Sequence, residues 1–220
     1  MPKRKNKYIM VGIDEAGRGP LAGPVAVAAV AATSNKKQVT RNKQSPNLKF
    51  KNSKLFKNIK DSKKLSAKQR EEWTEIIKNN FECKVAMVGA ETIDRIGINR
   101  AIKLAIARVL RKILCDITSA TAPTISHLVL LDGLLHAPKR YNQKTIIKGD
   151  EKIPLISAAS IIAKVARDKK MMCFHKNNSE YCFDRHKGYG TKLHYKMIKK
   201  NGISPIHRKT YLKKIVAKLK

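Results

Sequence analysis

The chain has 220 residues and a mass of 24.7 kDa, and 42% of its residues are hydrophobic. A chain of this size and composition can bury a core, which argues against disorder throughout and favours one globular domain, with or without a small appendage. Its 48 Lys and Arg residues against 16 Asp and Glu give a net charge of +32, which is typical of proteins that bind nucleic acid or an anionic membrane surface.

The cysteines and the apolar segments argue for a soluble, cytoplasmic protein. The four cysteines match neither a zinc-binding pattern nor a dense disulfide framework, so we expect a reducing compartment. A basic N-terminus precedes an apolar stretch that ends near Ala32, but Asp14, Glu15 and Arg18 interrupt it, and we reject a signal peptide. No run reaches the roughly 18 apolar residues that a membrane span needs, so no membrane-spanning segment is expected, and we do not expect a membrane to be the main partner.

The first predicted elements form a hairpin. Residues 8–14 are typical of a buried strand and residues 25–31 of a second one, joined by a Gly- and Pro-rich turn over residues 18–24. The stretch that follows, at about residues 33–60, holds nine Lys or Arg and no acidic residue. We expect it to be a basic, mobile insertion that contributes nothing to a core.

Strands then alternate with helices. A capping box from Ser66 to Gln69, with Trp73, Ile76 and Ile77 behind it, predicts a helix of about four turns whose apolar stripe faces a sheet. The further predicted elements are a strand over 83–90, an amphipathic helix over 98–113, a strand over 128–131, a short strand over 145–147 and an Ala-rich helix over 156–172. This order predicts an α/β fold, a mixed sheet flanked by helices.

The C-terminal region is strongly basic. Residues 185–220 hold twelve Lys or Arg and no acidic residue, which indicates contact with phosphates. An apolar stripe at helical spacing near the end consists of Leu212, Ile215, Val216 and Leu219. Three histidines in this region, His186, His194 and His207, are expected to be solvated or hydrogen-bonded, because none has zinc-ligand partners nearby in the sequence.

Four acidic residues stand at the ends of predicted elements in apolar surroundings. Asp14 and Glu15 close the first strand, Asp132 closes the fourth, and Asp168 lies near the end of the Ala-rich helix. A buried carboxylate normally has a cation or a metal as its partner, and ligands of open α/β sheets bind at strand ends. Each acid alone is more often a cap or an ion-pair partner. As a group they suit Mg²⁺ or Mn²⁺, and two such ions can hold a phosphodiester during attack by water.

The geometry of these acids raises two points. Neighbours on a strand point to opposite faces, so Asp14 and Glu15 need a bend to reach one site, which the glycines that follow make possible. Ser160, Lys164 and Asp168 are spaced four residues apart and share one helix face. Lys164 could therefore hold the Asp168 carboxylate or contact a phosphate.

Several motifs resemble those of ribonuclease HII, the type II ribonuclease H. The opening signature of that family resembles residues 12–25, GIDEAGRGPLAGPV. Further motifs agree in order and approximate spacing, and the similarity spans roughly residues 8–210. They are DSKKLS at 61–66, LDG at 131–133, KGD at 148–150, SAASIIAKV at 157–165 followed by Arg167 and Asp168, HKGYGT at 186–191 and PIHR at 205–208.

The resemblance implies a fold, an activity and its cofactors. The fold is ribonuclease H-like, with a catalytic domain over residues 1–180 and a small basic helical region over 181–220 that contacts the substrate. The activity is that of an endonuclease that hydrolyses the RNA strand of RNA/DNA hybrids and nicks duplex DNA at embedded ribonucleotides. Two Mn²⁺ or Mg²⁺ ions would serve as cofactors. The cleaved strand would carry 3′-hydroxyl and 5′-phosphate ends. The resemblance also favours a monomer and leaves contact with a replication clamp open.

The resemblance also assigns roles to residues. The metal-site and catalytic residues of the family fall on Asp14, Glu15, Asp132 and Asp168. Substrate binding falls on Gly17, Arg18, Gly19, Lys63, Lys164 and Tyr189. Among these, the glycine-arginine-glycine backbone would contact the ribose 2′-hydroxyl, and Tyr189 would check the same nucleotide.

Two other functions stay open on composition alone. A noncatalytic nucleic-acid binder would carry the same charge, and a basic amphipathic C-terminal helix could lie on an anionic membrane. The placement of the acids discriminates between an endonuclease and a noncatalytic binder, because phosphate binding alone gains nothing from carboxylates that converge where the phosphate should lie.

Overall fold

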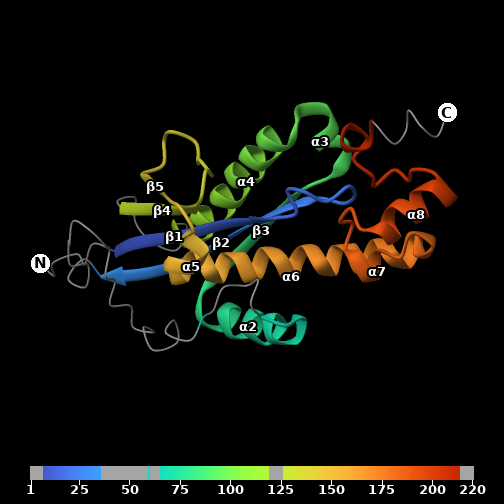
Figure 1. The fold of residues 1–220 in the computed structure, drawn as a ribbon. Helices are drawn as coiled ribbons and strands as arrows, with labels where there is room; N and C mark the ends of the chain where they lie inside the picture. The colour runs from blue at the N-terminus through green and yellow to red at the C-terminus, as the bar shows by residue number, and fades with distance from the viewer. Residues whose placement is uncertain (1–6, 36–58, 60–64, 119–125, 214–220) are drawn as a thin grey trace, which may run out of the picture.

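The computed structural model of the chain describes residues 7–35, 59, 65–118 and 126–213. Within these residues, five strands form one sheet in the order β3-β2-β1-β4-β5, and helices cover both of its faces (Figure 1). The predicted mixed sheet flanked by helices is confirmed. Most of the predicted basic insertion, Lys63 and the apolar stripe beyond Leu212 lie outside the described residues.

Every strand and helix predicted before residue 180 is present, and the short helices α3 and α5 are additional. The strands are β1 (Lys7–Ala16), β2 (Val25–Asn35), β3 (Glu82–Val88), β4 (Ser126–Asp132) and β5 (Gln143–Ile146). The helices are α2 (Ala67–Asn80), α3 (Ala90–Ile96), α4 (Ile98–Thr118), α5 (Gly149–Lys152), α6 (Pro154–Asn177), α7 (Phe183–His186) and α8 (Lys192–Asn201). Two 3-10 turns follow helices, η3 (Ser179–Tyr181) and η4 (Lys209–Tyr211).

The strand directions determine where a site can form. β1 pairs with β2 as an antiparallel hairpin, as predicted, and the hairpin extends through residues 33–35, which we had assigned to the insertion. On its other side β1 pairs with β4 in parallel, and β4 pairs with β5 in parallel. The carboxyl ends of β1, β4 and β5 therefore meet at one end of the sheet, where ligands of α/β proteins bind.

Alternate residues of β1 belong to two different cores. Ile9 and Ile13 pack with α4 on one face of the sheet, whereas Met10 packs with α6 on the other. At Gly12 a Cβ atom would lie 2.3 Å from the main-chain carbonyl of Leu155. Only glycine therefore allows α6 to approach β1 this closely.

The helix α2 differs in part from the prediction. Its capping box is formed by Ser66 and Gln69, and Ile77 is buried. However, Ile76 is 38% exposed, and α2 packs mainly against α6 rather than against the sheet (Figure 1). The physical reason is that α6 already covers this face, so α2 needs only a narrow apolar stripe.

The C-terminal region is tied to the body of the protein by buried side chains. Tyr181 and Phe183 pack with Ala22, and Leu212 packs with Leu21. Both contacts are made with the loop between β1 and β2. Among the described residues, no helix combines the length and the apolar character needed to cross a membrane.

Candidate active site

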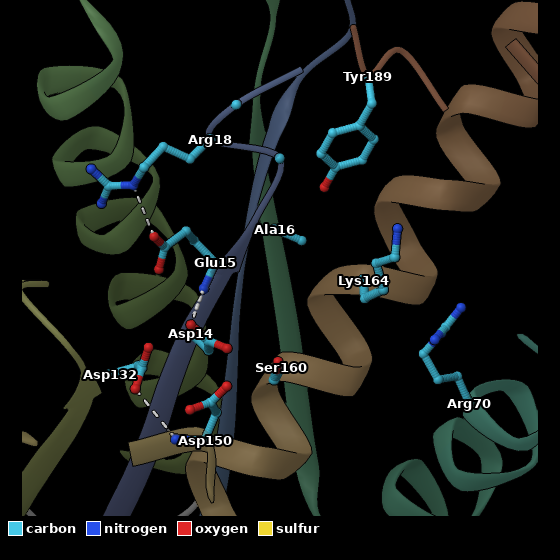
Figure 2. Close-up of a pocket in the computed structure, with 12 residues that line it drawn as sticks. Asp14, Glu15, Ala16, Arg18, Arg70, Asp132, Asp150, Ser160, Lys164 and Tyr189 are labelled. Atoms are coloured by element: carbon cyan, nitrogen blue, oxygen red, sulfur yellow. Dashed lines mark hydrogen bonds and ion pairs between the residues drawn. The ribbon is translucent and has the colours of Figure 1, made fainter. Parts of the chain in front are cut away.

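A pocket of about 350 Å³ opens at the carboxyl ends of β1 and β4 (Figure 2). Eight of the ten predicted site residues line it: Asp14, Glu15, Gly17, Arg18, Gly19, Asp132, Lys164 and Tyr189. Arg70, Asp150 and Ser160 line it as well, without having been predicted for it. Lys63 lies outside the described residues.

Three aspartates converge in the lower half of Figure 2. Asp14, Asp132 and Asp150 each offer a carboxylate oxygen, and these oxygens lie within 4.8 Å of one another. The sheet brings them together, because Ile13 of β1 is in register with Leu131 of β4, so that Asp14 and Asp132 leave adjacent parallel strands at the same level.

Main-chain hydrogen bonds fix the cluster. Oδ1 of Asp132 accepts from the N–H of Gly149 at 2.6 Å and from the N–H of Asp150 at 3.3 Å. These bonds draw the start of α5 toward the end of β4 and place Asp150 beside Asp132. Oδ1 of Asp14 accepts from the N–H of Glu15 at 2.7 Å.

The electrostatics of the cluster are unfavourable without a cation. Burial raises the pKa of Asp14 well above its ordinary value, and the nearby carboxylates of Glu15 and Asp132 raise the pKa further, against the hydrogen bond from Ser160. Asp14 is only 5% exposed, so water screens this repulsion little. A buried set of hard oxygen donors fits a divalent metal ion, whose charge removes the repulsion.

The structure does not bring Asp168 to this cluster, and Asp150 lies there instead. The Asp168 carboxylate pairs with Nζ of Lys164 at 2.9 Å, and Asp168 lines a different hollow, between α2 and α6, together with Glu71. Ser160, which faces Asp14, lies eight residues earlier on the same helix, a distance of roughly 12 Å along the axis at about 1.5 Å per residue.

A signal for Asp150 was present in the sequence. The KGD motif follows the short predicted strand over 145–147, and the rule that selected Asp14 and Asp132 at strand ends applies equally to an aspartate placed just after β5. The match of Asp168 to a helix motif obscured it.

Glu15 reaches the pocket without the bend that we expected. Alternation along β1 is kept: Asp14 points to the α6 side, toward Ser160, and Glu15 points to the α4 side. There Oε1 of Glu15 accepts from Nε of Arg18 at 3.1 Å, and Nη1 of Arg18 donates to Asn99 at 3.0 Å. The pocket lies around the end of the strand, so side chains of both faces line it (Figure 2).

The loop after β1 forms the upper wall of the pocket. Gly17 has a φ of +94°, and a Cβ atom there would lie 2.1 Å from Nε of Arg167, so glycine is required twice over. Gly19 differs, since a Cβ atom there would meet nothing within 4 Å. The packing of the described residues leaves open space at Gly19, which a ligand could approach.

Tyr189 faces the carboxylates from the opposite wall (Figure 2). Its ring is 40% exposed, and Nζ of Lys164 and the guanidinium of Arg167 lie 5.6 and 5.4 Å from the ring centroid. Such cations hold an aromatic ring in place by attraction to its face. The ring is thus held by cations and remains partly exposed at the pocket.

Comparisons with known proteins agree on one family. The sequence model of ribonuclease HII matches residues 11–214. The chain is 42% identical over 210 residues to ribonuclease HII of Endomicrobium trichonymphae, an alignment that covers 94% of this chain and 87% of that one. It is 38% identical over 210 residues to ribonuclease HII of Coxiella burnetii (strain Dugway 5J108-111), with 95% and 91% covered.

Solved structures give the same result for the fold. The chain superposes on ribonuclease HII from the PCNA:RNase HII complex of Archaeoglobus fulgidus with a TM-score of 0.69, 26% identity and 96% of both chains covered. Ribonuclease H2 of Pyrococcus horikoshii shares the fold with a TM-score of 0.65 at 24% identity, with 96% of this chain and 98% of that one covered. The ribonuclease H-like fold is therefore confirmed. By sequence, fold and acidic site together, the chain belongs to the ribonuclease HII family and is a metal-dependent endonuclease that cleaves RNA in RNA/DNA hybrids and at ribonucleotides embedded in DNA.

Proposed function

We propose that Asp14, Asp132 and Asp150, with Glu15 beside them, hold two Mn²⁺ or Mg²⁺ ions and form the catalytic centre of this endonuclease. The observation that carries the proposal is the convergence of three carboxylate oxygens within 4.8 Å at the ends of parallel strands. Purely structural reasons do not explain it, because buried like charges destabilise a fold unless a cation lies between them.

The chemistry follows from these donors. Two bound divalent ions would activate a water molecule and stabilise the leaving oxygen, which gives 3′-hydroxyl and 5′-phosphate ends. The protein contributes the fixed directions of its carboxylates, set by hydrogen bonds from Gly149 and Glu15. Lys164, which lines the same pocket, supplies a positive charge near the substrate phosphates.

The remaining pocket residues recognise the substrate. The loop Gly17, Arg18 and Gly19 and the exposed ring of Tyr189 face the carboxylates from two sides, where a nucleotide would lie between them. We assign to the loop contact with the ribose 2′-hydroxyl, and to Tyr189 stacking on the same nucleotide. The net charge of +32 supplies attraction to the duplex that does not depend on sequence.

The setting of the enzyme is part of the same proposal. We propose a monomer that acts in the cytoplasm, with residues 1–180 as catalytic domain and residues 181–220 as a basic region that contacts the duplex. The structure of the Archaeoglobus relative is that of its complex with PCNA. A clamp partner for this chain is proposed from that relative alone.

The test is cleavage of a DNA duplex that contains one ribonucleotide, with Mg²⁺, with Mn²⁺ and with EDTA, the nick being mapped on a sequencing gel. Asp150→Asn should lower kcat by at least about a hundredfold, because it removes a ligand of the metal ions that stabilise the transition state. Asp168→Asn is the matched control. It breaks one partly exposed ion pair but leaves the charge of Lys164 and every carboxylate of the cluster in place, so cleavage should stay within about threefold of wild type.

Two results would contradict the proposal. Full metal-dependent cleavage by Asp150→Asn would remove Asp150 from the catalytic centre, and a loss in Asp168→Asn as large as in Asp150→Asn would restore the assignment made from the helix motif. Cleavage that persists in EDTA would contradict a role for divalent metal.

A further inference from the structure

Two guanidinium groups are buried beside the pocket without an acidic partner. Arg167 of α6 and Arg208 near the C-terminus are both 0% exposed, and neither forms an ion pair with a carboxylate among the described residues. A buried cation without a counter-charge costs free energy, so stability alone does not account for these two residues. The hydrogen-bond partners of Arg208 show what this residue does instead.

Arg208 donates its hydrogen bonds to main-chain carbonyls of the loop after β1. Its Nη2 donates to the carbonyl of Gly17 at 2.7 Å, its Nη1 to that of Arg18 at 2.9 Å, and its Nε to that of Gly23 at 3.0 Å. The hydroxyl of Tyr211 donates to the carbonyl of Arg18 as well, at 3.1 Å. The C-terminal region thus holds the peptide groups of a loop that lies close to 190 positions earlier in the chain.

Fixing a carbonyl also fixes the N–H of the next residue. In a planar trans peptide the C=O and the N–H point in opposite directions. Because Arg208 draws the carbonyls of Gly17 and Arg18 toward itself, the N–H groups of Arg18 and Gly19 point away from Arg208. Neither N–H has an acceptor within the part of the chain that the structure describes.

These two donors lie where a ligand can reach them. Arg18 and Gly19 line the pocket, and the space beside Gly19 is open. Two successive N–H groups that point the same way form a concave site for an oxygen atom that accepts hydrogen bonds. A cation bound to the carbonyl side polarises the peptide group and makes its N–H a better donor.

We propose that Arg208, assisted by Tyr211, is the positioning residue that directs the N–H groups of Arg18 and Gly19 at the ribose, and thereby sets the preference of this enzyme for a ribonucleotide over a deoxyribonucleotide. This inference rests on the proposed ribose contact of the loop. It goes further in assigning the preference to a side chain that does not itself touch the substrate.

The readout is the affinity for a duplex with one ribonucleotide divided by the affinity for the same duplex made only of DNA. Kd is measured by fluorescence anisotropy for a duplex with one ribonucleotide and for the same duplex made only of DNA, with Ca²⁺ in place of Mg²⁺ and with a gel to confirm that the duplex stays intact. The ratio is independent of the fraction of protein that is folded. A general loss of stability or of positive potential weakens binding to both duplexes equally and leaves the ratio unchanged.

Two variants loosen the loop to different degrees. Arg208→Lys keeps the charge but cannot direct three hydrogen bonds, and we expect the ratio to fall about tenfold, as for the loss of one or two good hydrogen bonds. Tyr211→Phe removes one of the bonds to the carbonyl of Arg18, and the ratio should fall about threefold. Tyr141→Phe is the matched control: it removes a tyrosine hydroxyl that accepts a hydrogen bond from the neighbouring Arg140, and the ratio should not change.

The outcomes separate this inference from the proposed function. A wild-type preference that survives intact in Arg208→Lys overturns the positioning role and leaves the ribose contact of the loop standing. An equal fall of the ratio in Tyr141→Phe also overturns it, because the effect would then not depend on the loop. A wild-type ratio of one overturns the ribose contact itself, and this inference with it.

Discussion

At the scale of single residues, the site is a balance between buried charge and its compensation. Asp14 lies in a pocket with three other carboxylates, and burial raises its pKa well above the ordinary value. The folded state without metal therefore carries an electrostatic cost that is absent from the unfolded chain. Enzymes retain such strain where a ligand relieves it.

Replacement of this charge has an effect on stability that can be measured without any substrate. Asp14→Asn should raise the Tm of the metal-free protein by a few degrees, since about 1 kcal/mol shifts the Tm of a protein of this size by roughly 2–4 °C. Added Mn²⁺ should raise the Tm of wild type but not that of the variant, because the variant lacks a metal ligand. Differential scanning calorimetry with and without Mn²⁺ measures both.

The control for this prediction is Asp168→Asn, whose carboxylate lies outside the cluster. It should keep the Mn²⁺-dependent rise in Tm. An Asp14→Asn protein that is less stable than wild type without metal and still responds to Mn²⁺ would show that Asp14 is a structural hydrogen-bond acceptor and not a metal ligand.

At the scale of elements, the site depends on how closely α6 packs on β1. α6 carries Ser160 and Lys164, and its distance from the sheet sets how these side chains face Asp14. Gly12 sets that distance, because any side chain there would collide with main-chain atoms of Leu155, which cannot rotate away.

Adding a methyl group at Gly12 or at Gly19 should therefore distinguish a glycine needed for helix packing from one needed for contact with the substrate. Gly12→Ala should destabilise the protein by about 1–3 kcal/mol through overpacking and lower activity as α6 moves outward. Gly19→Ala, where a methyl group meets nothing within 4 Å, should leave the Tm unchanged and yet lower the rate of cleavage at a single ribonucleotide. Thermal unfolding and the nicking assay on both variants check this.

Either variant, Gly12→Ala or Gly19→Ala, can contradict the role assigned to its glycine. Equal losses of Tm in the two variants would contradict the assignment of Gly12 to helix packing. Unchanged cleavage by Gly19→Ala would mean that the substrate backbone does not approach Gly19.

At the level of the whole molecule, a buried histidine cluster lies in the C-terminal region, where His207 forms a β-bridge with Ala22 of the loop after β1. The ring of His186 stacks on that of His194 at 4.2 Å, and Nε2 of His194 lies 3.0 Å from Nε2 of His207. We had expected these histidines to be solvated or hydrogen-bonded, and they are hydrogen-bonded but buried. A bond between two imidazole nitrogens needs one neutral acceptor, so protonation of both rings would break it.

This cluster predicts an acid-sensitive fold. Burial, followed by repulsion from His186, lowers the pKa of His194 to about 4; burial likewise lowers that of His207 to about 4. Between pH 6.5 and pH 4 the unfolded chain binds more protons than the folded one, so stability falls as the pH falls, by up to about 1.4 kcal/mol per pH unit for each histidine, and levels off below that window.

Urea unfolding across pH 7.5 to 4 measures the slope, and His207→Gln provides the comparison. The variant cannot titrate at this position, so its stability should depend less steeply on pH within the same window. Identical slopes in both proteins would assign the acid sensitivity to other groups.

Most of the elements and much of the site could be predicted from the amino-acid sequence, because both follow from local chemistry. Alternation, helical spacing and a capping box identified the strands and helices, and the rule that acids at strand ends bind ligands identified Asp14 and Asp132. The same local chemistry identified the loop that contains Gly17 and Gly19. These signals lie within a few residues of one another, where backbone geometry alone relates sequence to structure.

Which acids meet, and what holds the loop, follows from the packing of elements that are far apart in the chain. The parallel pairing of β4 with β5 brings Asp150 to the cluster, whereas the direction of α6 carries Asp168 away from it. The contact of Arg208 with the loop joins residues close to 190 positions apart. Such contacts depend on how the elements pack, and no periodicity in a single sequence records that packing.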